Sequence, residues 1–219
     1  MKNTCMLLCI GLLTLTGSLV AQDAKAGPQM AITKGSNISR PADAPPPGVS
    51  VLYSNLGSKS DTYYDSEGWT ISGPDSELGF SQNIAEPFTL SATSTVKGLQ
   101  VAAQWAGGGT DNVAVALLAD ANGTPGKIIK VWNVSNLPTF GTCCGLVTVV
   151  DQAGISVTGG TQYWVAVGTD KASITAFDVW DYTYNLSTGT FAYEGTNTSN
   201  VWEVTSGTQS AFAVYGTTP

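Results

Sequence analysis

The feature that most constrains this chain is the alternation of short apolar runs and turn residues between residues 49 and 217. The runs are rich in Val, Thr and aromatic residues, and glycine clusters such as Gly107–Gly109 and Gly159–Gly160 separate them. No stretch keeps the i, i+3, i+4, i+7 apolar spacing of an amphipathic helix. The pattern therefore predicts strands joined by turns over this whole segment.

About a dozen short strands are expected between these turns. They cover residues 51–53, 68–72, 88–91, 97–105, 113–119, 127–134, 146–150, 162–169, 174–182, 190–194, 201–204 and 211–215. Strands this short and this numerous bury their apolar faces best as two packed antiparallel sheets. The expected fold is all-β, an antiparallel two-sheet β-sandwich of jelly-roll-like form. A propeller is less favoured because no internal repeat of fixed period is present.

Two of the expected strands are apolar on both faces. In the segment 113–119, one face carries larger apolar residues and the other carries smaller ones. The segment 162–169 also alternates between two apolar sets, which is typical of a strand in the centre of a sheet. We expect Tyr163, Val165 and Val167 to be the residues of this strand that face the core.

The first 26 residues have the pattern of an export signal. Lys2 precedes an apolar run over residues 6–20, and Ala24–Ala26 fits a small-x-small cleavage site, although cleavage after Ala21 also fits. The run is too short for a membrane-spanning helix, which needs about 20 apolar residues. We expect residues 1–26 to be a cleaved signal peptide, with a retained anchor as the alternative.

The rest of the chain divides into a linker and one domain. Residues 27–48 form a Pro-rich linker, in which consecutive prolines favour extended backbone. Residues 49–217 form the β-sandwich domain, which is long enough to bury a core. No later segment is apolar enough to span a membrane, so the mature chain is expected to be exported, as a secreted, periplasmic or cell-surface protein.

Charge and composition exclude several classes of function. The chain has 9 basic and 16 acidic residues and no histidine, so its formal net charge is −7. Without histidine, a Ser-His-Asp triad and a His-ligated zinc are excluded. The acidic balance disfavours nucleic acid as a partner. From Val131 onward Lys171 is the only basic residue, so this half should repel polyanions and favour neutral or cationic ligands.

Several motifs along the domain follow the order of a known family. An Asp-x-x-Gly-x-Pro-Gly turn at 120–126 is followed by Gly-Thr-x-Tyr-Trp at 160–164, and the last strand is Ala-Phe-Ala-Val-Tyr-Gly at 211–216. Over roughly residues 50–216 the chain resembles the bacterial exported β-sandwich domains called "choice-of-anchor" domains, here without an evident C-terminal sorting tail. The resemblance implies the sandwich fold and export, and it implies no catalytic residues.

Cys143 and Cys144 form an unusual adjacent pair. Cys5 and Cys9 lie in the predicted signal, so the pair holds the only cysteines of the mature chain. An oxidising compartment favours a disulfide between the two neighbours, although two free thiols or an intermolecular bridge are alternatives. A rigid apolar loop tip of this kind can contact a ring-shaped ligand.

Three carboxylates precede Trp69 and suggest a metal site. They are Asp61, Asp65 and Glu67. Calcium takes six to eight oxygen ligands, often from one loop, so these residues are the candidate ligands of a structural calcium. Solvated loop carboxylates are the alternative interpretation, and no other cofactor is expected.

The six tryptophans offer stacking surfaces for sugar rings, but most lie inside apolar strands and should pack in the core. Trp180 and Trp202 are the best candidates for exposure, because Asp178 and Asp181 flank the first and Glu203 follows the second. The candidate ligand-binding residues are Trp180, Tyr182, Trp202, Glu203, Cys143 and Cys144.

These features favour a non-catalytic exported module for binding or for cell-surface or matrix structure, with a neutral glycan or another surface component as the expected partner. The alternative is a glycoside hydrolase that uses a Glu194/Glu203 carboxylate pair, because the two residues fall on neighbouring expected strands. This alternative fails if the two carboxyls point to opposite faces of the sheet.

Overall fold

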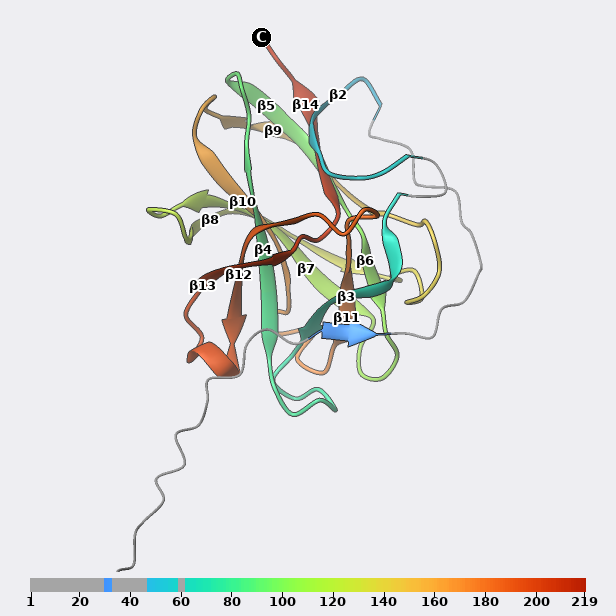
Figure 1. Cartoon of the computed structure of the whole chain (residues 1–219). Coiled ribbons are helices and arrows are strands. Elements are labelled where there is room, and N and C mark those ends of the chain that lie inside the picture. Colours follow the sequence, from blue (N-terminus) through green and yellow to red (C-terminus); the bar gives the residue numbers. More distant parts are fainter. Residues whose placement is uncertain (1–29, 33–46, 59–61) are drawn as a thin grey trace, which may run out of the picture.

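The computed structural model describes residues 30–32, 47–58 and 62–219 (Figure 1). These residues form fourteen strands and one short 3-10 helix, and none of them lies in an α-helix. The predicted signal peptide, residues 1–26, and most of the predicted linker lie outside the described residues.

The larger of the two sheets has ten strands and curls into a half-barrel. Seven strands follow one hydrogen-bonded path, in the order β6 (Ala103–Trp105), β11 (Phe177–Tyr182), β3 (Tyr64–Ser72), β4 (Gln82–Thr89), β10 (Gln162–Gly168), β7 (Asn112–Asp120) and β8 (Pro125–Ser135). Off this path, β1 (Met30–Ile32) pairs with β3, and β12 (Thr188–Gly195) pairs with both β4 and β13 (Glu203–Thr208). The 3-10 helix Thr196–Thr198 lies between β12 and β13 in the sequence.

The smaller sheet has four strands, in the order β2 (Ser50–Ser54), β14 (Phe212–Thr217), β5 (Ser94–Val101) and β9 (Val147–Val157). All strand pairs in both sheets are antiparallel, so the predicted all-β two-sheet sandwich is confirmed. Several strand boundaries differ from the prediction, among them β4, which begins at Gln82, and the following two. Met30–Ile32, inside the predicted linker, pairs with β3. The strand expected at 174–182 begins only at Phe177, because a hydrogen-bonded turn at Asp170 precedes it.

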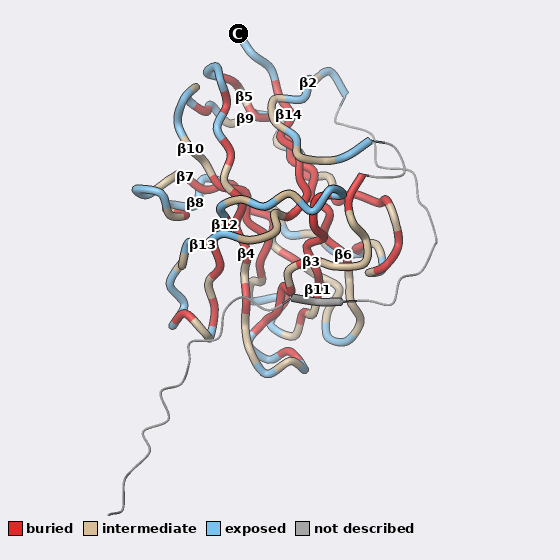
Figure 2. The backbone as a smooth tube through the Cα atoms, in the orientation of Figure 1, coloured by how far each residue is buried: buried red, intermediate tan, exposed pale blue. Residues whose placement is uncertain are grey.

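The main core lies between the two sheets, and Figure 2 shows the buried segments gathered in the interior. Val165 and Val167 are fully buried there, and Tyr163 packs against the same cluster, so the predicted facing of this strand is confirmed. Trp180 is also fully buried. Its indole Nε1 donates to the Ala211 carbonyl at 2.9 Å.

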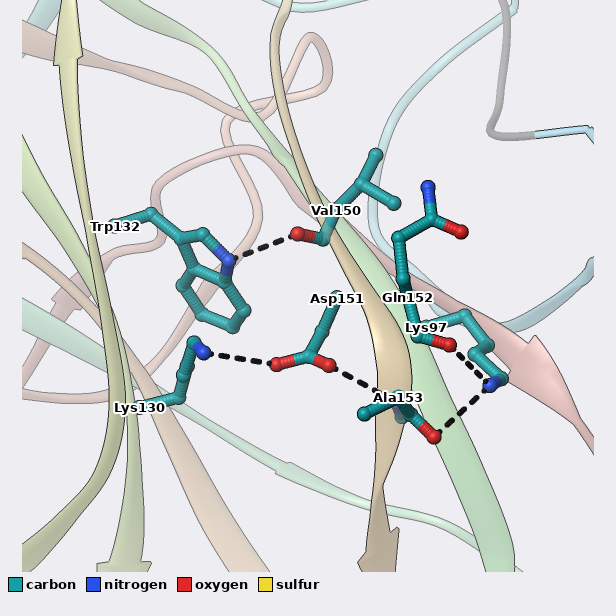
Figure 3. A network of polar contacts seen from close by, with 8 residues as sticks. Lys97, Lys130, Trp132, Val150, Asp151, Gln152 and Ala153 are labelled. Carbon is teal, nitrogen blue, oxygen red and sulfur yellow. Dashed lines mark hydrogen bonds and ion pairs between the residues drawn. The ribbon is translucent and has the colours of Figure 1, made fainter.

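Side chains from β8 tie the edge of the large sheet to β9, the edge of the small one (Figure 3). Trp132 Nε1 donates to the Val150 carbonyl at 3.1 Å, and Lys130 Nζ lies 3.1 Å from an Asp151 carboxylate oxygen. On the other side of β9, Lys97 Nζ donates to the carbonyls of residues 152 and 153. These contacts use polar groups that two open sheet edges would otherwise expose.

Candidate functional site

A second apolar cluster lies on the outer face of the large sheet, on the side away from the core. Its buried members are Ala85, Ala116, Leu118, Trp164, Ala166 and Ala192. Ala166 on β10 is opposite Ala85 on β4 and Ala116 on β7, and Ala192 on β12 is also opposite Ala85. Alternate residues of a strand point to opposite faces, so these alanines lie on the outer face while the valines between them point into the core. Because alanine side chains are short, they leave a low region on the outer face of the sheet.

A groove of about 380 Å³ lies over this low region. Its floor includes Ala114, Ala116, Ala166 and Gly168. One wall comes from β12, β4 and the residue before β13, and the opposite wall comes from β8, because the strand order across the groove is β13, β12, β4, β10, β7, β8. The wall residues are Glu194, Trp202 and Asn83 on the first side and Ile128 and Val131 on the second, with Thr169 and Asp170 at the end of β10.

Glu194 and Asn83 form the polar part of the first wall. Asn83 Nδ2 donates to Glu194 Oε1 at 3.2 Å, and the Thr169 backbone N–H donates to Asn83 Oδ1 at 2.9 Å. The bond from the Thr169 N–H sets the orientation of the Asn83 amide, and the amide group then holds the Glu194 carboxyl in place. Burial raises the pKa of Glu194 above its ordinary value, although the hydrogen bond from Asn83 acts in the opposite direction.

Gly168 makes room for this arrangement. A Cβ atom added at Gly168 would lie 2.7 Å from Asn83 Cγ and 3.0 Å from Asn83 Cβ, which is closer than side-chain carbons pack. The absence of a side chain at Gly168 therefore allows Asn83 to lie against β10 and to hold Glu194 at the groove wall.

Asp170 is the second carboxyl at the groove, and it is half-buried. Its Oδ1 accepts hydrogen bonds from the backbone N–H groups of Ala172 and Ser173, at 2.8 and 3.1 Å, and from Ser173 Oγ at 3.0 Å. These bonds build a tight turn of the kind that Asp favours. They hold one carboxylate oxygen and set the position of the other.

Trp202 is half-buried and packs against the outer cluster while it also lines the groove. In the same cluster, Trp164 is fully buried, and its Nε1 donates to Asp120 Oδ1 at 2.8 Å. Asp120 Oδ2 accepts from the Gly123 N–H at 2.9 Å. The turn motif at 120–126 and the strand motif at 160–164 therefore meet next to Leu118 and Gly126, which line the groove.

The structure brings only one of the predicted ligand-binding residues to this groove, Trp202. The prediction that Trp180 is exposed is wrong, and Tyr182 is only 2% exposed. Both edges of β11 are paired, with β6 and β3, and residues 178–182 are all buried, so neither face of this strand is open to solvent and the flanking Asp178 and Asp181 are buried too.

Glu203 faces away from the groove. It is paired with Tyr193 across the β12–β13 hairpin, and Tyr193 Oη donates to Glu203 Oε2 at 3.1 Å. Glu194 follows Tyr193 directly, so its side chain is on the opposite face of the sheet. The carboxylate pair predicted for a glycoside hydrolase, Glu194 with Glu203, is therefore not assembled.

Cys143 and Cys144 lie at disulfide distance. Cys144 is fully buried in the main core and Cys143 packs against it, so the pair is not the exposed loop tip that the sequence predicted, and neither residue lines the groove. The backbone around the pair is also held by hydrogen bonds. Tyr63 Oη donates to the carbonyls of Thr142 and Gly145 at 2.8 and 3.1 Å.

Of the predicted calcium ligands, Asp61 lies outside the described residues, and Asp65 and Glu67 are half-buried on β3. Among the residues that the structure describes, no group of three or more His, Cys, Asp or Glu side chains is placed to hold a metal ion. Calcium binding by these residues stays a prediction.

Three carboxyls lie fully buried between the strands: Glu86, Asp178 and Asp181. Both oxygens of Asp178 and of Asp181 lack a hydrogen-bond partner, and Glu86 accepts from the Ser210 N–H at 2.6 Å. Burial, with a smaller effect of nearby Asp111, raises the pKa of Asp178 to about 8. Burial also raises the pKa values of Asp181 and Glu86. Asp178 is therefore held as a neutral acid at mildly acidic pH.

Comparison with known proteins adds no family. No family model matches the sequence, and neither the curated proteins nor the solved structures give a match. Within the described part of the chain, no helix has the length and apolar character needed to cross a membrane.

Proposed function

We propose that this protein is an exported, non-catalytic binding module, and that the outer groove of its large sheet binds a carbohydrate chain that carries no negative charge. The observation that supports this most is the half-buried Trp202 beside the Asn83–Glu194 pair, above a floor of alanine and glycine.

The chemistry of the groove suits a sugar. The face of a pyranose ring is apolar and packs on an indole, while its edge carries hydroxyls that need hydrogen-bond partners. Trp202 offers the indole, and Glu194 and Asp170 offer acceptors whose positions are fixed by neighbouring bonds. Because the floor residues are small, a ring can approach the sheet closely.

Export and the absence of catalysis rest on separate observations. The signal-like segment 1–26 favours export, and a pair of adjacent cysteines at disulfide distance suits an oxidising compartment. The opposite facing of Glu194 and Glu203 supports binding over glycoside hydrolysis, which needs two carboxyls that flank the same bond.

The test is a glycan array probed with the mature domain, followed by titration calorimetry on the glycans that bind. Trp202→Ala should weaken binding about tenfold or more, which is the size of effect expected for loss of a stacked aromatic ring. Tyr184→Ala is the matched control, since Tyr184 is an exposed aromatic residue that does not line the groove. Equal binding by both variants, or no glycan binding by the unaltered domain, would overturn the proposal.

A further inference from the structure

We propose that the groove selects cationic amino sugars, whose protonated amine would lie between Glu194 and Asp170. This inference rests on the proposed function, because it names the class of sugar that the same groove would bind.

The groove is acidic and lacks compensating positive charge. Glu194 and Asp170 both line it, and none of its described lining residues is Lys or Arg. Lys171 follows Asp170 in the sequence without lining the groove. On the opposite wall, Lys130 is opposite Leu117, which faces the core, so its side chain points away from the groove and pairs with Asp151.

Both carboxyls keep acceptor capacity for a ligand. Asn83 donates to Oε1 of Glu194, and the turn at residues 170–173 uses Oδ1 of Asp170. An ionised carboxylate has two oxygens and only accepts hydrogen bonds, so the remaining oxygens favour a donor. An ammonium has three donors and a positive charge, and a hydrogen bond between two charged groups is about twice as strong as a neutral one.

The partial burial of Glu194 increases the preference for a cation. A charge at the edge of a protein interacts with a partner more strongly than the same charge in bulk water, because the local dielectric is lower. A neutral sugar in this groove would leave two carboxylates without a counter-charge, and a uronic acid would place a third negative charge beside them. The charge of the groove therefore ranks amino sugars first and acidic sugars last.

The experiment compares three oligosaccharides of equal length with the mature domain: an oligomer of glucosamine, the same oligomer with every amine acetylated, and an oligomer of a uronic acid. Calorimetry at about pH 6 and low salt should give binding of the glucosamine oligomer about tenfold tighter than that of the acetylated one. Raising the salt from about 0.05 M to about 0.5 M should weaken only the binding of the cationic oligomer, because salt screens charge pairs.

Two variants locate the effect. Glu194→Gln keeps an acceptor for the Asn83 amide, and Asp170→Asn keeps the acceptor of its turn, so both changes remove charge with little change of shape. Each change should weaken binding of the glucosamine oligomer about tenfold and leave binding of the acetylated oligomer unchanged. Asp75→Asn is the control for net charge, since Asp75 is exposed and does not line the groove.

The outcomes separate the two proposals. If the acetylated oligomer binds as tightly as the cationic one, and Trp202→Ala weakens both, the groove binds carbohydrate and the inference on charge is wrong. If Asp75→Asn weakens binding of the glucosamine oligomer as much as Glu194→Gln does, the effect comes from net charge, and the groove does not select the amine. If none of the three oligomers binds, the inference fails for these ligands, and the glycan array decides the proposed function independently.

Discussion

The two faces of the large sheet are made by alternate residues of the same strands, yet they differ in side-chain size and in the state of their carboxyls. On β7 and β10, Val115, Leu117 and Val165 fill the core, whereas Ala116 and Ala166 leave space on the outer face. Inside, Asp178, which shares the core face of β11 with Trp180, is buried with no hydrogen-bond partner. On the outer face, the carboxyls of Glu194 and Asp170 are held by specific donors at the rim of a groove.

The difference shows where the sheet tolerates change. The inner face contributes most of the buried apolar area, so it determines the stability of the fold. The outer face has small side chains in a half-open groove, so substitutions there should alter binding more than stability.

The largest contrast should be between two tryptophans. Trp180 is fully buried and contacts Phe212 edge-on, with ring centroids 6.1 Å apart. Trp180→Ala should lower the free energy of unfolding by about 3–5 kcal/mol, since it leaves a cavity in the core. Trp202→Ala should lower it by about 1 kcal/mol or less, because Trp202 lies at the half-open groove. Urea denaturation of both variants measures the contrast, and equal losses would contradict it.

The second prediction uses Asp178, a buried acid of the inner face. The folded-state pKa of Asp178 is raised to about 8, whereas an unfolded Asp titrates near pH 3.9. The contribution of this group to stability is therefore complete below about pH 4 and is lost as the pH rises towards 8, at up to about 1.4 kcal/mol per pH unit. Asp181 and Glu86, whose pKa values burial also raises, act in the same direction.

We therefore expect the domain to be more stable at pH 5 than at pH 8 in denaturant titrations. Asp178→Asn cannot ionise and should reduce this difference by about 1–3 kcal/mol. The exposed Asp75→Asn serves as the control and should leave the pH dependence unchanged. A pH profile that is the same in Asp178→Asn and the unaltered domain would show that Asp178 is ionised in the folded state.

The third prediction concerns the outer face. Gly168→Ala places a Cβ against Asn83, which must move and release its hydrogen bond to Glu194. Binding of the groove ligand should weaken severalfold, and the stability loss should be about 1 kcal/mol. Adding Asn83→Ala to Gly168→Ala should recover part of that stability, because the clash is gone, but none of the binding. Additive stability losses in the double variant would argue against this contact.

Sequence patterns predicted the inner face well. Alternation along 162–169 identified a central strand and the residues of that strand that face the core, because period-two patterning reports burial directly. Alternation along 113–119 also gave a face of smaller residues on that strand. It could not show a groove, because the depth depends on which distant strands lie beside β7 and β10, and β4 and β12 join them through long-range pairing.

The errors have a common physical cause. Trp180 and Tyr182 were expected at the surface because Asp178 and Asp181 flank them, and buried Asp is rare. Here both acids are buried with the aromatic residues, because neither face of β11 is open to solvent over residues 178–182. Asn83 was missed because its role depends on a contact with residue 194, which lies far away in the sequence. Asp170 forms a local turn with Ser173, but its place at the groove depends on the pairing of distant strands, which no local pattern encodes.

The smallest effect on stability should come from reducing Cys143 and Cys144. A ring closed between adjacent residues barely restricts the unfolded chain, so its loss should change the free energy of unfolding by less than about 1 kcal/mol. The surrounding segment is also held by bonds that do not involve sulfur. Gln104 Nε2 donates to Tyr63 Oη at 2.6 Å, and Tyr63 Oη donates to the Thr142 carbonyl. Reduction should therefore speed amide exchange in residues 138–146 only, while exchange in the sheets is unchanged.

Thiol titration of the denatured, non-reduced mature protein should find no free thiol, and the protein should run as a monomer without reductant. Two thiols per chain would contradict the disulfide, and a dimer that reductant dissolves would show that the cysteines pair between chains.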